Sequence, residues 1–164
     1  MNHAVLLLGS NLGEQQKNLD NACVLIEENA GKIISFSSVY KTEPWGYASE
    51  NWFYNRVIKI ETTMDVFLLF EKTCEIEKKM GRSDKTEMNY TDRLIDIDIL
   101  FFDNLILKTT RIEIPHPRLH LRKFTLIPLV EIMPDFVHPV FNKTIKNLLE
   151  ECEDPGKVAK TVSL

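Results

Sequence analysis

The stretch RLIDIDILFFDN (residues 93–104) decides the fold, because it combines a buried-strand pattern with two acidic side chains. Ile95, Ile97 and Ile99 alternate as in a β-strand, and the apolar run continues to residue 102. Asp96 and Asp98 share the other face, about 6–7 Å apart at the rise of a strand. With an effective dielectric of about 20, their repulsion is about 2–3 kcal/mol before any desolvation. The pattern therefore predicts a strand whose acidic pair needs compensation.

Length and composition predict one compact domain over residues 1–164. The chain is 44% hydrophobic and 27% charged, and this composition can form a sizeable hydrophobic core without disulfide or metal cross-links. The three cysteines are far apart and form no metal-spaced cluster, which disfavours disulfides and zinc and favours a reducing cytoplasm. No secretory segment or apolar run of spanning length occurs, so we expect a cytoplasmic protein without membrane contact.

The charge balance argues against nucleic-acid binding. The formal net charge is −4, the pI is about 5.6, and no block of lysine and arginine occurs. An RNA-binding domain would need basic strands with exposed aromatic side chains. We therefore expect no nucleic-acid partner. A monomer is a separate expectation, which does not follow from the charge.

Strand and helix patterns alternate along the chain. Strands are predicted at residues 3–9, 32–41, 53–62 and 93–104, and helices at 11–31 and 65–80. Asp103 and Asn104 would turn the last strand into a hairpin with residues 105–108. The order βαββαβ with this additional hairpin strand predicts an α+β, ferredoxin-like sandwich, with C-terminal helices at 126–134 and 142–152 completing the packing. On this plan the aspartates face the side of the sheet opposite its helices.

A divalent cation is the simplest compensation for the aspartate pair. Magnesium binds one or two protein carboxylates together with water and substrate phosphates. The alternative is that Asp96 and Asp98 are solvated, or form ion pairs with Arg82 and Arg93.

Basic residues near the aspartates in sequence favour a polyphosphate substrate. They are Arg82, Lys85, Arg93, Arg111, Arg118, Arg122 and Lys123. Arginine binds phosphate oxygens in a planar fork, so metal and arginines together indicate phosphoryl or pyrophosphoryl transfer. A P-loop motif is absent from the sequence, and the turn Gly9-Ser10-Asn11 is too short to identify a nucleotide site. Asn11 is predicted to cap the following helix.

Single residues in the C-terminal half leave alternatives open. His116 stands between two prolines that stiffen its loop, so it either donates to a phosphate oxygen or is an ordinary loop histidine. Phe53 and Phe124 could enclose a flat ring, although from the residues alone core positions are favoured.

Four segments together resemble one family. LLLGSNLG (6–13), SSVYKTEPWGYASENWFYN (37–55), RLIDIDILFFDN (93–104) and IPHPRLHLRKFTLIPL (114–129) occur in the order found in 6-hydroxymethyl-7,8-dihydropterin pyrophosphokinases of folate biosynthesis. The resemblance implies a ferredoxin-like fold that transfers pyrophosphate from ATP to the pterin hydroxymethyl group and releases AMP. It also implies two magnesium ions held by Asp96 and Asp98, which would compensate the acidic pair.

The resemblance assigns further roles. Arg82 and Arg93, both on a mobile catalytic loop, would join Asp96 and Asp98 in catalysis. The pterin would contact Thr42, Pro44, Trp45, Phe53, Asn55 and Phe124, which reverses the core assignment of the two phenylalanines. ATP would contact Glu77, Arg82, Ile99, Arg111, His116 and Arg122.

Three departures from the family pattern fall near the nucleotide. The segment before the first aspartate reads NYTDRLI, so Tyr90 stands where many members carry tryptophan, and Cys74 and Asp84 replace a glutamine and a basic residue of some members. A non-catalytic, small-molecule-binding ferredoxin-like regulatory domain is the alternative function. Magnesium-dependent release of AMP would separate the two.

Overall fold

A computed structural model describes residues 1–46, 48–81 and 93–161. The first half contains β1 (Asn2–Ser10), α1 (Gln15–Asn29), β2 (Lys32–Phe36), β3 (Tyr40–Thr42), β4 (Phe53–Thr62) and α2 (Val66–Lys79). The second half contains β5 (Asp96–Phe102), β6 (Leu107–Lys108), β7 (Glu113–Ile114), a 3-10 turn (Leu119–Leu121), α3 (Lys123–Ile132), α4 (Ile145–Glu151) and β8 (Val158–Lys160). Most of these elements match the predicted ranges.

The main sheet is antiparallel and has the order β5-β1-β4-β3-β8, with β2 also paired to β4. The single strand predicted at 32–41 is wrong, because β2 and β3 are separate strands. Between them Ser37 Oγ accepts a hydrogen bond from Val57 N at 3.0 Å, and Ser38 N donates to the Glu131 carboxylate at 3.0 Å. At the break one backbone bond remains, from Ser37 N to Val57 O at 2.8 Å, and side-chain hydrogen bonds supplement it.

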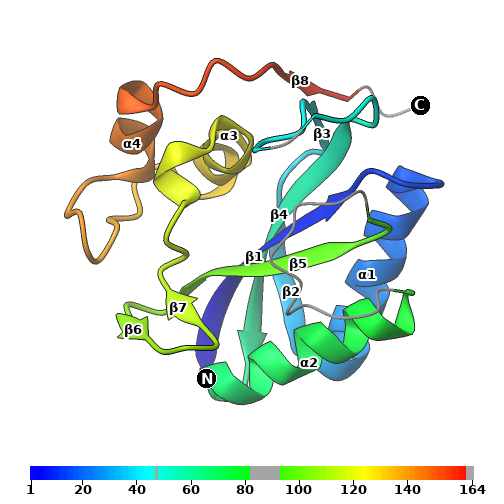
Figure 1. The fold of residues 1–164 in the computed structure, drawn as a ribbon. Coiled ribbons are helices and arrows are strands. Elements are labelled where there is room, and N and C mark those ends of the chain that lie inside the picture. The colour runs from blue at the N-terminus through cyan, green and yellow to red at the C-terminus, as the bar shows by residue number, and fades with distance from the viewer. Residues whose placement is uncertain (47, 82–92, 162–164) are drawn as a thin grey trace.

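Helices cover both faces of the sheet (Figure 1). On one face α1 and α2 bury a cluster that includes Ala4, Leu6, Leu8, Leu19, Ile26, Ile58, Leu69 and Ile97. On the other face α3 and α4 pack Leu126, Leu129, Ile145 and Leu148 against Val5, Leu7, Val57 and Phe101. The face predicted to be open is therefore covered over one part, and the aspartates lie on the remaining part.

The predicted hairpin between residues 93–104 and 105–108 is also wrong. The chain does turn at Asp103, which has φ 47°, but β6 pairs with β7 in a separate two-stranded sheet. The turn that closes this hairpin is at residues 109–112, where Thr109 N donates to Ile112 O at 2.9 Å. Asp103 N instead donates to His3 O and so continues the pairing with β1.

Helix α2 begins and ends at residues that favour helix caps, whereas helix α1 does not begin at its predicted cap. In α2, Asp65 accepts a hydrogen bond from Leu68 N at 2.9 Å, and Gly81 has φ 109° just beyond the C-cap. The N-cap of α1 is Glu14, without a side-chain cap, so the predicted cap at Asn11 is wrong. The Asn11 side chain instead forms hydrogen bonds with the backbone of Arg93 and Asn51.

Among the described residues, the longest apolar helices remain too short and too polar to span a bilayer.

Candidate active site

Strand register brings the predicted site residues onto one face of the sheet. Gly9 of β1 lies opposite both Asn55 of β4 and Asp96 of β5. Two pairs further along, and therefore on the same face, Leu7 lies opposite Asp98. Because directly opposed residues of antiparallel strands share a face, residues from three neighbouring strands meet there.

Gly9 forms the floor of this region. A Cβ atom built on it would lie 2.9 Å from Asn55 Oδ1 and 3.4 Å from Phe53 Cδ1. A side chain at this position would therefore displace the Asn55 carboxamide and touch the Phe53 ring. The close approach of Asn55 to the Gly9 backbone explains why this position of the GSN turn is a glycine.

A β-bulge shapes the aspartate strand. Val5 pairs with Phe101 and Leu6 with Ile99, which leaves Leu100 as the additional residue. The Leu100 carbonyl accepts a hydrogen bond from His116 N at 2.9 Å. The bulge thus attaches the loop that carries His116 beside the aspartates.

His116 is held at two points, as its flanking prolines suggested. Besides its backbone contact, its Nδ1 accepts a hydrogen bond from Arg118 N at 3.1 Å. In the neutral ring the proton is then on Nε2. His116 is therefore oriented to donate from Nε2.

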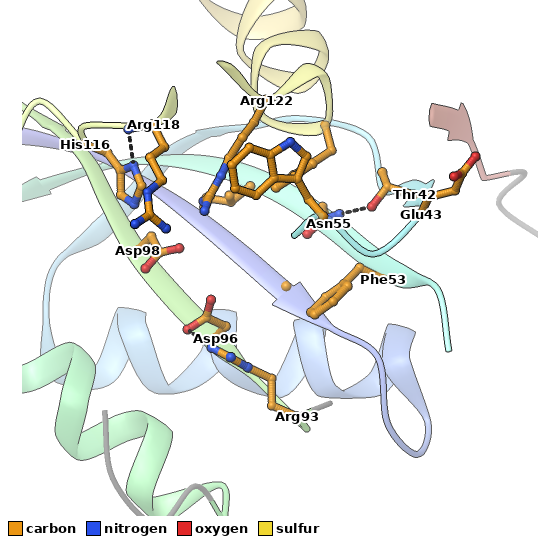
Figure 2. Close-up of a pocket in the computed structure, with 14 residues that line it drawn as sticks. Thr42, Glu43, Phe53, Asn55, Arg93, Asp96, Asp98, His116, Arg118 and Arg122 are labelled. Atoms are coloured by element: carbon orange, nitrogen blue, oxygen red, sulfur yellow. Dashed lines mark hydrogen bonds and ion pairs between the residues drawn. The ribbon is translucent and has the colours of Figure 1, made fainter. Parts of the chain in front are cut away.

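These residues enclose a cavity of about 220 Å³ (Figure 2). It is lined by Leu7, Gly9, Thr42, Glu43, Trp45, Phe53, Asn55, Arg93, Asp96, Asp98, His116, Arg118, Arg122 and Phe124. Aromatic rings and charged groups thus share one hollow.

Charges of both signs meet on the β5 side of the cavity. Arg93 Nη1 lies 3.2 Å from Asp96 Oδ1, and Figure 2 shows Arg118 and Arg122 extending toward the aspartates. Arg122 is only 7% exposed. Burial lowers the pKa of Arg122, and the negative charge of Asp98 is the main opposing influence. The buried cation and this carboxylate therefore support each other.

The opposite side of the cavity is aromatic with a fixed polar edge. Asn55 Nδ2 donates to Thr42 Oγ1 at 2.6 Å, and both residues are buried. The Arg122 guanidinium lies 4.6 Å from the centroid of the Trp45 ring and 5.5 Å from that of Phe124. A planar guanidinium thus lies beside Trp45 and beside Phe124, one of the two rings predicted to enclose a flat ligand.

The cavity does not gather every predicted residue. Pro44 lines an adjoining hollow together with Trp45 and Phe124. Glu77 is buried under β5, where Oε1 accepts a hydrogen bond from Ile97 N at 2.7 Å. Ile99 belongs to the core of the α1–α2 face, while Arg111 is exposed, 5.6 Å from the centroid of the Phe70 ring.

Arg82 lies outside the described residues, as do Lys85, Asp84 and Tyr90, together with the loop predicted to be mobile.

Four lining residues received no role from the sequence: Leu7, Gly9, Glu43 and Arg118. Leu7 and Gly9 line the cavity because of how β1 pairs with β4 and β5, and no local sequence pattern specifies that pairing register. Arg118 is two residues beyond His116 and was counted among the basic residues, which is the signal that could have placed it here.

The donor set fits a metal that shares its ligands with a substrate. Within the described ranges no group of three or more His, Cys, Asp or Glu side chains could enclose a cation. Asp96 and Asp98 instead offer two carboxylates at the wall of an accessible cavity. Magnesium bound to one or two carboxylates, water and phosphate oxygens suits this arrangement.

Comparison with known proteins identifies the family. The model of the 7,8-dihydro-6-hydroxymethylpterin-pyrophosphokinase (HPPK) family matches residues 5–134. The chain belongs to the HPPK family. This match confirms the family suggested by the four sequence segments.

Curated HPPK relatives are similar over most of the chain. The 2-amino-4-hydroxy-6-hydroxymethyldihydropteridine pyrophosphokinase of Bacillus subtilis (strain 168) is 37% identical over 132 residues, covering 80% of this chain and 78% of the relative. The enzyme of the same name from Aquifex aeolicus (strain VF5) is 35% identical over 144 residues, covering 88% of each chain.

Solved HPPK structures share the fold. A triple mutant of Plasmodium falciparum HPPK-DHPS superposes with a TM-score of 0.76 at 20% identity, covering 92% of this chain. The matched region is 43% of that longer chain, so this chain corresponds to less than half of the Plasmodium protein. The similarity confirms the predicted α+β, ferredoxin-like architecture.

Proposed function

We propose that the protein transfers pyrophosphate from ATP to the hydroxymethyl group of 6-hydroxymethyl-7,8-dihydropterin and releases AMP, as a step of folate biosynthesis. The observation that carries this proposal is the cavity in which two aspartates, three arginines and three aromatic rings meet. Membership of a pyrophosphokinase family adds support and disfavours the regulatory-domain alternative.

The pterin is assigned to the aromatic side of the cavity. A flat heterocycle with polar edges needs stacking faces and a few fixed donors and acceptors. Phe53, Phe124 and Trp45 supply faces, while the hydrogen-bonded pair of Thr42 and Asn55 supplies a rigid polar edge. The backbone near Pro44 would complete that edge.

The triphosphate of ATP is assigned to the cationic side. His116 can donate from Nε2, and Arg118 and Arg122 extend into the same part of the cavity. A phosphate oxygen beside buried Arg122 would compensate its desolvated charge. Adding Arg118 to this set goes beyond the residues expected from the sequence.

The adenine is assigned to the outer edge of β5. Ile97 N points away from β1, because it donates to Glu77. Ile99 has the same parity along the strand, so its N–H also faces that edge and can donate to an acceptor of the purine ring. Glu77 holds this strand edge from α2, and Arg111, on the segment that leads into β7, lies over the Phe70 ring of the same helix.

Two magnesium ions are assigned to Asp96 and Asp98. Bound there, the ions would stabilise both the attacking hydroxyl and the oxygen that leaves with AMP. The chain's own contribution is to hold the two carboxylates on one strand face and to place Arg93 beside them. Arg93, with Arg82, would neutralise charge that grows on the transferred group. Asp98 is the candidate to accept the hydroxyl proton.

The test is AMP release measured by chromatography with ATP, the hydroxymethyl pterin and magnesium. AMP and the pterin diphosphate should appear in equal amounts, and chelation of magnesium should stop both. ATP alone should yield no AMP. ADP as the product, or AMP formed without the pterin, would contradict the proposal. The monomeric state and the cytoplasmic location stay predictions, which gel filtration and cell fractionation can check.

A further inference from the structure

Asn11 forms an unusual two-point contact with the backbone of Arg93. Its Oδ1 accepts a hydrogen bond from Arg93 N at 2.7 Å, and its backbone N donates to Arg93 O at 3.1 Å. Asn11 is 2% exposed. The backbone N–H and the side-chain oxygen of one buried residue therefore reproduce together the paired hydrogen bonds that a strand neighbour would make.

This contact holds Arg93 where the sheet does not. The β1–β5 ladder begins at Gly9 and Asp96, so Arg93 lies beyond its end. The guanidinium of Arg93 nevertheless reaches Asp96, with Nη1 3.2 Å from Oδ1, and the side chain is mostly buried. Asn11 is what fixes the Arg93 backbone relative to β1, which forms the cavity floor.

A third bond anchors Asn11 itself. Its Nδ2 donates to Asn51 O at 3.2 Å, in the segment that leads to Phe53. Gln15 makes a separate bond to this segment, from Nε2 to Trp52 O at 2.7 Å. The carboxamide of Asn11 is thus oriented by one bond and orients Arg93 by the other.

We propose that Asn11 is a positioning residue for the transfer step, holding Arg93 so that its guanidinium meets the transferred group beside Asp96. The inference rests on the proposed pyrophosphokinase function. It assigns a role to the GSN turn beyond connecting β1 to α1.

The first experiment compares steady-state kinetics of Asn11→Ala with the wild type. Misplacement of a catalytic group by about 1 Å can cost about 100-fold in rate. We expect kcat to fall about 10–100-fold, with the KM values for ATP and pterin changing less than about threefold, because an interaction made in the transition state is lost. A raised pterin KM with unchanged kcat would overturn the proposal. It would show that Asn11 matters through its hydrogen bond to Asn51, in the segment that leads to Phe53, and not through Arg93.

Asn18→Ala is the matched control. Asn18 Nδ2 donates to Ser10 Oγ at 3.1 Å and to Leu12 O at 2.9 Å, so the variant also loses two hydrogen bonds of this turn. It leaves Arg93 untouched and should keep kcat within about twofold. An equal loss in both variants would show that turn integrity, rather than Arg93, is what matters.

A double-mutant cycle with Arg93→Ala decides whether Asn11 acts through Arg93. In the Arg93→Ala background, Asn11→Ala should change kcat less than about twofold, because the group that it positions is gone. Independent, multiplying losses would overturn the proposal. If Asn11→Ala does not fold, the same cycle is made with Asn11→Ser, whose shorter polar side chain cannot make both contacts.

The two proposals fail in different ways. Wild-type protein that releases no AMP under the conditions above contradicts the pyrophosphokinase function. If the wild type is active but the losses in kcat caused by Asn11→Ala and Arg93→Ala multiply independently, only the positioning role is contradicted.

Discussion

At the residue scale, Asp96 and Asp98 have different surroundings although they share one strand face. Asp96 forms an ion pair with Arg93, and Asp98 is the acidic group that most supports the buried charge of Arg122. The ion-pair alternative considered from the sequence is therefore realised for Asp96. It does not replace the metal hypothesis, since both carboxylates still line the cavity.

Asp98→Asn separates these roles. The variant keeps the shape of the side chain but removes one anionic ligand, so turnover at saturating magnesium should fall by about 100-fold or more. Without metal the melting temperature should change by only a few degrees, because lost repulsion from Asp96 and lost attraction to Arg122 oppose each other. Magnesium with an ATP analogue should raise the melting temperature of the wild type far more than that of the variant. Near-normal turnover in Asp98→Asn would exclude the metal site.

Phe124→Ala tests the pterin subsite. Removing one stacking face should weaken pterin binding by about 1–3 kcal/mol, while ATP binding should barely change. Phe136→Ala is the control, because Phe136 packs against the same core, 4.9 Å from Phe101 between ring centroids, and does not line the cavity. Calorimetry with each ligand separately gives the answer. Equal losses in both variants would make Phe124 a core residue only.

At the scale of elements, local patterns predict what lies within an element better than how elements pair. The strand at β4 and the helix at α2 agree with prediction because alternation, an N-cap and a terminal glycine act within one segment. The break at Ser37 and the pairing of β6 with β7 depend on bonds to distant residues, such as Glu131. No local pattern encodes those bonds.

The contact between α2 and the edge of β5 depends on Glu77. Glu77→Leu should destabilise the protein by about 1–3 kcal/mol, because the Ile97 N–H loses its buried acceptor. Glu77→Gln keeps an oxygen at the same position and should cost less. Urea unfolding of the two variants and the wild type measures the difference. Equal stability of Glu77→Leu and the wild type would show that this bond does not hold the strand edge.

At the scale of the whole molecule, the site lies where β1, β4 and β5 meet the start of α3. The sequence resemblance supplied most lining residues, including Phe53, Asp96 and Arg122. The residue pattern alone identified the acidic pair and its cationic neighbours. It could not supply Leu7 or Gly9, because their approach to the aspartates follows from the order β5-β1-β4, a property of the assembled sheet.

The second face also carries a buried histidine that should make stability depend on pH. His138, between α3 and α4, accepts hydrogen bonds at Nδ1 from Val140 N at 3.1 Å and Phe141 N at 3.2 Å. Burial, with a smaller contribution from nearby His120, lowers the pKa of His138 from 6.5 to about 4. The unfolded chain therefore takes up this proton first as the pH falls.

Stability should accordingly be complete above the unfolded pKa of about 6.5 and decline as the pH falls toward 4. His138→Asn removes the titrating ring but keeps an oxygen that can accept the same backbone N–H groups. Between pH 7 and pH 4.5, the melting temperature of the variant should therefore fall less than that of the wild type, since the buried titrating ring is gone. Parallel melting curves across this range would contradict the assignment. They would place the acid sensitivity of the α3–α4 face in other groups, because a histidine that binds its proton equally in both states contributes no slope.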